Sequence, residues 1–116
     1  MTSQAPAYFR AVAIDYDGTL ADGQVKSDIL AVLAEARARR NRVILVTGRI
    51  MSELEAVFPG ALDHVDAIVA ENGAVLATRA GLRLLAAPVG RAVSAGLGAR
   101  GVAHRSGQVL VACAAG

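Results

Sequence analysis

The chain has 116 residues, of which 54% are hydrophobic, and a formal net charge of +2. This length predicts one domain with a core of its own, and the single cysteine excludes an internal disulfide and fits a reducing compartment. No apolar run reaches the roughly 18 to 20 residues that cross a bilayer, and the chain does not begin with a secretion signal, so we expect a soluble, cytoplasmic protein without a membrane partner.

The first predicted element is a buried strand over residues 8–15, an apolar run that ends at a glycine-containing turn. Asp15 and Asp17 stand two residues apart at its carboxyl end, and side chains alternate along a strand, so both carboxylates point to the same side. Two like charges at this spacing repel each other unless a cation lies beside them. We interpret the pair as a divalent-metal and phosphate site. For this motif alone, an ordinary turn rich in Asp and Gly remains open.

A helix follows, with Ser27 as its N-cap, apolar residues at helical spacing, and Asn41 at its end. Residues 42–46 predict a second strand, and their uninterrupted apolar run is typical of a strand covered on both faces. This strand leads into Thr47, Gly48 and Arg49. These residues supply a hydroxyl, a position for close backbone approach and a cation that pairs with phosphate.

A second helix is expected over about residues 51–57, because Pro59 and Gly60 end it, and a third strand over residues 67–70. Asn72 and Gly73 then give a tight-turn signal that predicts a hairpin. The remainder contains strand candidates at residues 82–85 and 108–113 and a helix candidate at residues 89–97.

The order strand, helix, strand, helix, strand predicts a parallel sheet with right-handed crossovers. Ligands of such sheets bind beyond the carboxyl ends of the strands. The polar residues at those ends are Asp15, Asp17, Thr47, Gly48, Glu71 and Asn72. The sequence therefore predicts one site at this edge, with Asp15 placed to be a nucleophile and Asp17 a proton donor. Thr47 and Gly48 could hold the phosphoryl oxygens.

The charges are unevenly distributed, because all ten acidic residues lie at or before Glu71 while arginines continue to Arg105. Such a basic half could bind nucleic acid. These arginines stand singly, however, and no aromatic residues accompany them for stacking on bases. We expect solvated arginines and no nucleic-acid partner, or an acidic complement that belongs to further chain.

Three segments together, residues 15–20 (DYDGTL), 43–49 (VILVTGR) and 71–74 (ENGA), resemble the haloacid dehalogenase (HAD) superfamily, in particular its Cof-type and sucrose-phosphatase-like branch. The resemblance implies an α/β fold: a three-layer, Rossmann-like core with a parallel sheet, followed by an α/β cap. Residues 1–78 would be the N-terminal portion of that core, and residues 79–116 the start of the cap.

The resemblance also implies a Mg²⁺-dependent phosphatase that acts through an aspartyl-phosphate on a sugar phosphate or similar small metabolite. Asp15 would be the nucleophile and a metal ligand. Asp17 would be the acid/base, with its backbone carbonyl on the metal. Thr47 would bind phosphate, with Arg49 and Asn72 near the substrate. Glu71 would support local structure rather than catalysis.

Two parts of the family pattern are missing from the chain. The only lysine, Lys26, lies before the first helix, away from the family's phosphate-steadying lysine, and no acidic residue follows Glu71 to complete the metal site. Asp63 and Asp66 precede the third strand and are interpreted as loop carboxylates. We therefore expect the N-terminal half of a HAD phosphatase. Its exposed sheet edge and apolar surface would pair with a missing C-terminal half or with a second copy.

Two other functions stay open. A non-catalytic HAD-like module could bind phosphate or a partner without turnover, because the lysine and the later acids are absent. A phosphoacceptor receiver domain also uses carboxylates, a threonine and a parallel sheet, but there the acids lie on different strands and a lysine follows. His64 and His104 lack metal-ligand spacing, and Cys113 is expected to be a small buried apolar residue.

Overall fold

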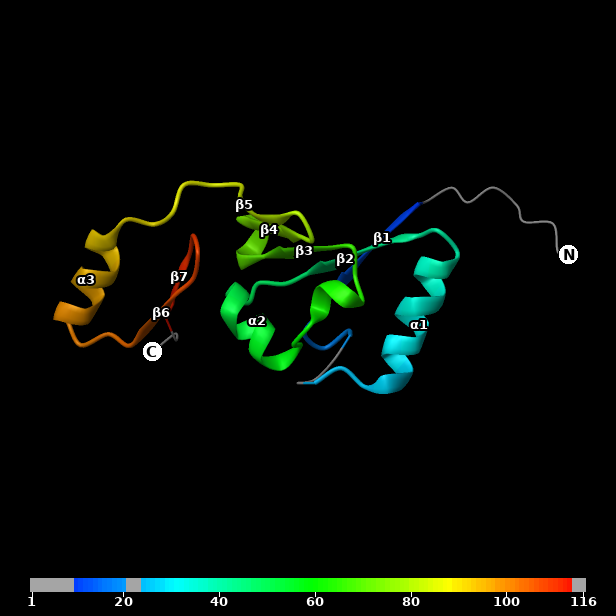
Figure 1. The fold of residues 1–116 in the computed structure, drawn as a ribbon. Helices are drawn as coiled ribbons and strands as arrows, with labels where there is room; N and C mark the ends of the chain where they lie inside the picture. The colour runs from blue at the N-terminus through cyan, green and yellow to red at the C-terminus, as the bar shows by residue number, and fades with distance from the viewer. Residues whose placement is uncertain (1–9, 21–23, 114–116) are drawn as a thin grey trace, which may run out of the picture.

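A computed structural model of the chain describes residues 10–20 and 24–113 (Figure 1). Its elements are β1 (Ala11–Asp15), α1 (Ser27–Ala38), β2 (Arg42–Val46), α2 (Met51–Val57), η1 (Ala61–Asp63), β3 (Ala67–Ala70), η2 (Glu71–Gly73), β4 (Val75–Thr78), β5 (Gly81–Leu84), α3 (Arg91–Ala99), β6 (His104–Ser106) and β7 (Val111–Cys113). No helix in these two ranges is long and apolar enough to span a bilayer.

A five-stranded sheet in the order β1-β2-β3-β4-β5 forms the body of the molecule, with α1 and α2 packed beside it (Figure 1). β1, β2 and β3 are parallel, which confirms the α/β, Rossmann-like core that the sequence predicts. β4 and β5 run antiparallel, so the expectation of a parallel sheet holds for the first three strands only. The short turn between β3 and β4 explains the change, because a parallel neighbour requires a crossover of a dozen or more residues.

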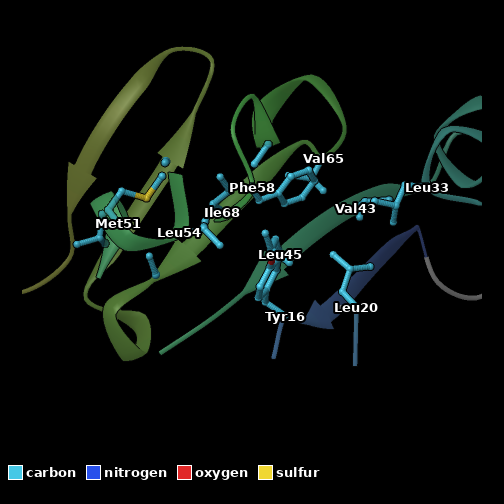
Figure 2. Packing of buried hydrophobic residues seen from close by; sticks show 14 of the residues in the cluster. Tyr16, Leu20, Leu33, Val43, Leu45, Met51, Leu54, Phe58, Val65 and Ile68 are labelled. Atoms are coloured by element: carbon cyan, nitrogen blue, oxygen red, sulfur yellow. The ribbon is translucent and has the colours of Figure 1, made fainter. Parts of the chain in front are cut away.

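The apolar core lies between the sheet and its helices (Figure 2). β2 contributes Val43 and Leu45, which are 1% and 0% exposed, while Ile44 on the other face is half-buried. α2 contributes Leu54 and β3 contributes Ile68, both almost completely buried. Each such side chain stabilises the fold by about 1.5–3 kcal/mol. β2 is thus fully buried on one face and only partly covered on the other, so the prediction of a strand covered on both faces holds in part.

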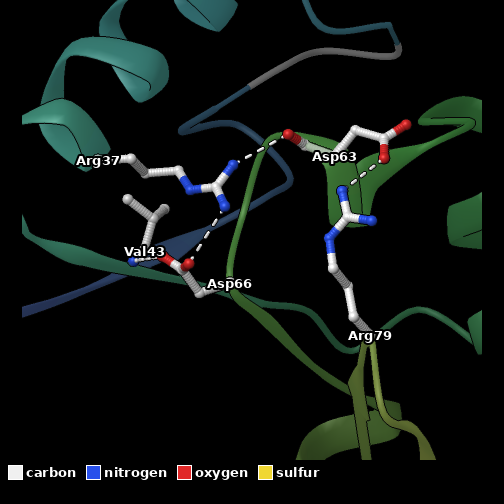
Figure 3. A network of polar contacts seen from close by, with 5 residues as sticks. All are labelled: Arg37, Val43, Asp63, Asp66 and Arg79. Carbon is white, nitrogen blue, oxygen red and sulfur yellow. Dashed lines mark hydrogen bonds and ion pairs between the residues drawn. The ribbon is translucent and has the colours of Figure 1, made fainter.

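A polar network ties α1 to the loop before β3 (Figure 3). The guanidinium of Arg37 donates to the Asp63 carbonyl at 2.9 Å and to the Asp66 carboxylate at 3.2 Å, and Asp66 also accepts from the Val43 N–H at 2.8 Å. The Val43 hydrogen bond, with Arg37 adding to it, lowers the pKa of Asp66 against the opposing effect of burial. Asp63 pairs with Arg79 at 2.7 Å. Asp66 is a loop carboxylate, as the sequence indicated, whereas Asp63 is the last residue of η1.

The ends of α1 match the sequence in part. Ser27 is the first residue of the helix and not its N-cap, a position that Lys26 occupies without any side-chain capping bond. At the other end, the Asn41 side-chain amide donates to the Ala36 carbonyl at 3.1 Å, which satisfies one of the carbonyls that a helix leaves unpaired. The helix itself ends at Ala38 with Arg39 as its C-cap, so Asn41 supports the end of the helix from three residues beyond it, and the prediction holds in part.

The last third of the chain departs further from the prediction. Helix α3 follows Gly90, and it begins and ends two residues later than expected. Of the expected strand at residues 108–113, only the second half is a strand, β7, and it pairs with β6, which the sequence did not predict. Cys113 is exposed, so its assignment to the core was wrong. We call β6, β7 and the turn of residues 107–110 between them the C-terminal ribbon; with α3 it lies at one end of the molecule (Figure 1).

Candidate active site

The carboxyl end of β1 carries the two aspartates that the sequence singled out. Asp15 is the last residue of β1. Tyr16 is 0% exposed, whereas Asp15 and Asp17 on either side of it are exposed. This alternation turns the tyrosine into the core and both carboxylates away from it. The Tyr16 ring packs against Phe58, with 6.1 Å between the ring centroids, and so anchors the segment that carries the two acids.

The end of β2 lies beside them, because Asp15 pairs in register with Val46 and Thr47 follows immediately. Thr47 is 2% exposed. Its backbone N–H donates to the Val69 carbonyl at 2.9 Å, and its hydroxyl accepts the Arg49 backbone N–H at 3.0 Å. The hydroxyl keeps its own proton, which it can donate to a ligand. Thr47 is thus fixed at the point where the first three strands end.

Arg49 and Asp17 form an ion pair between the ends of β1 and β2. The Arg49 Nε lies 3.0 Å from each carboxylate oxygen of Asp17, and Nη2 lies 2.8 Å from Oδ1. The hydrogen bond with Asp17 is the main reason that the pKa of Arg49 is raised. The two side chains are 31% and 50% exposed, so water screens the pair and it stabilises the fold by about 1 kcal/mol or less. The sequence predicted both residues for the site but not their contact.

The turn after β3 closes over the turn after β2. Gly48 has no room for a side chain, because an added Cβ would lie 2.7 Å from the Asn72 side-chain oxygen. The Asn72 N–H faces the Thr47 carbonyl at 3.4 Å, and the Glu71 N–H donates to the Arg49 carbonyl at 3.0 Å. Asn72 adopts a left-handed conformation with φ 57°, which asparagine tolerates well. The predicted hairpin is confirmed, since β4 returns antiparallel to β3.

The Glu71 side chain contacts residues far from it along the chain, which the sequence did not predict. Its carboxylate is 1% exposed and accepts backbone N–H groups from Met51 at 3.3 Å, Gln108 at 2.9 Å, Val109 at 2.8 Å and Leu110 at 3.1 Å. Burial raises the pKa of Glu71, but these four hydrogen bonds together outweigh burial and leave it below its usual value. Glu71 therefore fastens the C-terminal ribbon to the core, and nothing in the sequence connects positions so far apart.

The predicted site opens into a hollow of about 410 Å³. Its lining consists of Asp17, Gly48, Arg49, Ile50, Glu53, Arg105 and Ala112. Asp15 and Thr47 neighbour this lining along the chain. Arg105 comes from β6 and donates through Nε to Glu53 at 2.8 Å. Arg79 is also paired, with Asp63. The two arginine side chains are 57% and 68% exposed, so both are solvated as expected, although each has an acidic partner. No sequence pattern predicts that Glu53 or Arg105 lies at the site.

The donor set decides which metal the site could hold. Within residues 10–20 and 24–113, no three His, Cys, Asp or Glu side chains come together as a metal cage. Mg²⁺ is commonly held by one or two carboxylates, while water and substrate phosphate oxygens complete its coordination. The Asp15 carboxylate matches this pattern, because it is exposed at the end of β1. Asp17, whose carboxylate is paired with Arg49, could add its backbone carbonyl. These residues fit a largely hydrated Mg²⁺ ion rather than one enclosed by protein.

Comparisons with known proteins show which family and which solved structures the chain is similar to. A family model described as haloacid dehalogenase-like hydrolase matches residues 12–87. A haloacid dehalogenase-like hydrolase from B. subtilis shares 22% identity at a TM-score of 0.63, over 83% of this chain and 35% of that one. A HAD subclass IIB sugar phosphatase shares 24% identity at a TM-score of 0.57, over 80% of this chain and 38% of that one.

A HAD-superfamily phosphatase from Bacteroides thetaiotaomicron shares 21% identity at a TM-score of 0.56, over 88% of this chain and 41% of that one. The chain therefore spans less than half the length of these structures. A search of curated protein sequences finds no significant match.

Proposed function

The chain belongs to the haloacid dehalogenase-like hydrolases, and from this premise we propose that it is the N-terminal portion of a Mg²⁺-dependent phosphatase for a sugar phosphate or similar small, cytoplasmic metabolite. One observation carries the proposal. The ends of β1, β2 and β3 are linked by direct contacts: Asp17 with Arg49, Arg49 with Thr47, and Thr47 with Asn72. Residues 1–78 would belong to the catalytic core, and residues 79–116 would begin a cap over it.

In the first half of the reaction, a carboxylate oxygen of Asp15 attacks phosphorus and forms an aspartyl-phosphate as the bond to the leaving oxygen breaks. Asp17 gives that oxygen its proton, so the alcohol departs neutral. The Thr47 hydroxyl and the Gly48 N–H hold the phosphoryl oxygens. Mg²⁺ bound by Asp15 and Asp17 would offset the negative charge where carboxylate and phosphate meet.

In the second half, Asp17 takes a proton from water, and the water oxygen attacks the phosphorus of the aspartyl-phosphate. The bond to Asp15 breaks, inorganic phosphate leaves, and both carboxyl groups return to their starting states. Asn72 lies beside Gly48, which supports its proposed contact with the rest of the substrate. The position of Asp17 in the lining of the hollow supports its proposed role in both proton transfers.

The ion pair between Arg49 and Asp17 adds a step to the proposed reaction. Both Asp17 oxygens bond to the guanidinium, so Asp17 cannot donate a proton until Arg49 moves. A phosphate dianion is a better partner for guanidinium than one carboxylate, because it offers more negative charge and more acceptor oxygens. We propose that arriving phosphate draws Arg49 away, and that Asp17 then takes up a proton from solvent, which it passes to the leaving oxygen.

A non-catalytic role is the second candidate, and the position of Lys26 favours it. The only lysine of the chain lines a different hollow, with Gly18, Thr19 and Gln24, and not the one beside Arg49. No lysine of this chain therefore stands where the phosphate would be steadied. In this case the chain would bind phosphate and Mg²⁺ without hydrolysing the ester.

Hydrolysis of p-nitrophenyl phosphate separates the two candidates. We expect Mg²⁺-dependent release of p-nitrophenol, which Asp15→Asn lowers by about 10³-fold or more, because it removes the nucleophile. Asp63→Asn is the matched control, since Asp63 pairs with Arg79 at an exposed position outside the lining of the hollow, and it should leave the rate unchanged. Full activity in Asp15→Asn would contradict the mechanism. Binding of phosphate and Mg²⁺ without any turnover would support the non-catalytic role.

A further inference from the structure

The hollow beside the site has two walls from distant parts of the chain. Asp17, Gly48 and Arg49 form the wall proposed to handle the reacting phosphate, whereas Arg105 and Ala112 belong to the C-terminal ribbon. A ligand with its phosphate at the first wall therefore meets the ribbon with its other end. Arg105 is the charged residue that the ribbon offers there.

Arg105 is oriented in the way that arginines are often held to receive an anion. Its Nε donates to Glu53 at 2.8 Å, and its side chain is 57% exposed. Within the part of the chain that the structure describes, this is the one hydrogen bond that the guanidinium makes. Both terminal amino groups are therefore left to bind a ligand. Glu53 fixes the plane of the group, and the planar pair of amino groups matches two oxygens of a carboxylate or phosphate.

The ribbon itself is held in place from within. The buried Glu71 carboxylate bonds to Gln108, Val109 and Leu110 in the turn that follows β6. Gly107, between β6 and that turn, packs so tightly on this carboxylate that a Cβ there would overlap it. Arg105, two residues earlier, is thus presented to the hollow from an anchored backbone, and a preorganised group loses less entropy when it binds.

We infer that Arg105 is a specificity-determining residue that binds a second anionic group of the substrate. The inference rests on the proposed function and narrows it: the substrate is a phosphorylated small molecule with a further phosphate or a carboxylate. The reacting phosphate lies at Asp15, Thr47 and Arg49, and the second anion lies at Arg105. A neutral metabolite with one phosphate would leave the amino groups of Arg105 to water.

Three ligands with a common carbon skeleton test this inference: glucose 6-phosphate, 6-phosphogluconate and glucose 1,6-bisphosphate. Their dissociation constants are measured by calorimetry with Mg²⁺, using the Asp15→Asn chain so that no ligand is consumed. We expect at least one of the two doubly anionic ligands to bind about ten-fold more tightly than glucose 6-phosphate, the effect typical of hydrogen bonds to a charged group. Which one binds more tightly shows whether the second anion is a carboxylate or a phosphate.

Arg105→Gln in that background should reduce the preference to within about two-fold. The double change Arg105→Gln with Glu53→Gln should do the same, which excludes repulsion from an unpaired Glu53 as the cause. Arg83→Gln is the matched control, because Arg83 is exposed on β5 and its loss changes the net charge equally. It should keep the preference.

Several outcomes would overturn the inference: equal affinity for all three ligands, a preference that survives in the double variant, or a preference that Arg83→Gln also removes. The proposed function can be judged separately. If glucose 6-phosphate binds and the chain with Asp15 hydrolyses it, but Arg105 has no effect on the preference, only the inference fails. If none of the three ligands binds, both fail.

Discussion

At the scale of single residues, Glu71 combines two features that are each unfavourable alone. Its backbone is left-handed, with φ 53°, which costs a residue with a side chain about 1–2 kcal/mol. Its carboxylate is buried, which is costly for a charge without partners. The four backbone N–H groups that it accepts offset both costs, because hydrogen bonds to an ionised acceptor are about twice as strong as neutral ones.

Replacing Glu71 with Gln should lower the free energy of unfolding by about 2–3 kcal/mol at pH 7, because the amide turns a donor toward buried N–H groups. The pKa of Glu71 is lower in the folded chain than its usual value. Its contribution to stability is therefore complete above the unfolded value of about 4.3 and is lost as the pH falls through the lower folded value. Urea unfolding at pH 7, 5, 4 and 3 should show a shallower acid loss in Glu71→Gln.

The control for this experiment is Glu55→Gln, which removes an exposed carboxylate of the same helix that supplies Met51. Its unfolding curve should follow the unchanged chain at every pH. An acid loss of equal slope in Glu71→Gln and the unchanged chain would show that Glu71 does not carry this pH dependence.

Arg49→Gln should separate binding from stability. The ion pair with Asp17 is partly exposed, so the free energy of unfolding should change by less than about 1 kcal/mol. If Arg49 receives the arriving phosphate, KM for p-nitrophenyl phosphate should rise about ten-fold, the size of one charged hydrogen-bonding partner. Arg39→Gln, which breaks an exposed pair with Glu35 on α1, should leave KM unchanged. An unchanged KM in Arg49→Gln would rule out the proposed role of Arg49.

At the scale of elements, the attachment of the C-terminal ribbon can be tested without changing any charge. Gly107→Ala places a Cβ against the Glu71 carboxylate and should loosen the ribbon. We expect the amides of residues 108–110 to exchange with deuterium at least ten-fold faster, while β2 and β3 keep their rates. Gly98→Ala is the matched control, since its Cβ would meet only an ordinary contact with His104 at 3.8 Å. Unchanged exchange in Gly107→Ala would show that the ribbon is held elsewhere.

The same elements show what the sequence could predict. β2 and β3 were recognised because their apolar runs reflect burial in a parallel sheet, and the turn at Asn72 was recognised because its residues tolerate left-handed backbone. β6 was missed, because its three residues, His104–Ser106, are polar and largely exposed, and only their pairing with β7 makes them a strand. Local patterns predict local structure well, and they carry little information about which distant segments meet.

The candidate site shows the same contrast between local patterns and contacts of distant segments. Asp15, Asp17, Thr47, Gly48 and Asn72 could be named from the sequence, because each stands at the end of an apolar run. Glu53 and Arg105 could not, because helix α2 and the C-terminal ribbon bring them together only in the folded chain. The catalytic and binding roles of the residues named from the sequence stay predictions. The proposed domain boundary at residue 78 also stays a prediction.

At the scale of the whole molecule, the sheet ends at β1, which among the described residues pairs on one side only, with β2. Val12 on this strand is 41% exposed and Val32 on α1 is 61% exposed. An edge strand with exposed apolar residues is a template for pairing with another chain. We therefore expect light scattering to show self-association that increases with concentration.

Val12→Lys should shift this equilibrium toward the monomer, because a lysine on an edge strand opposes pairing. Val102→Lys is the control, since Val102 is similarly exposed, at 38%, but lies outside the sheet. A chain that remains monomeric at all concentrations would contradict the expectation that the exposed edge of β1 pairs with a second chain.

The hydrogen bonds of Glu71 also bear on the order in which the chain can fold during its synthesis. Three of its four N–H partners lie 37 to 39 residues later in the chain. A nascent chain that has left the ribosome only through β5 holds this carboxylate with Met51 alone, and water must supply the remaining bonds. The first three strands can pair at that time, but the interior around η2 stays hydrated until the turn after β6 emerges. Completion of the core thus depends on translation of its last described segment.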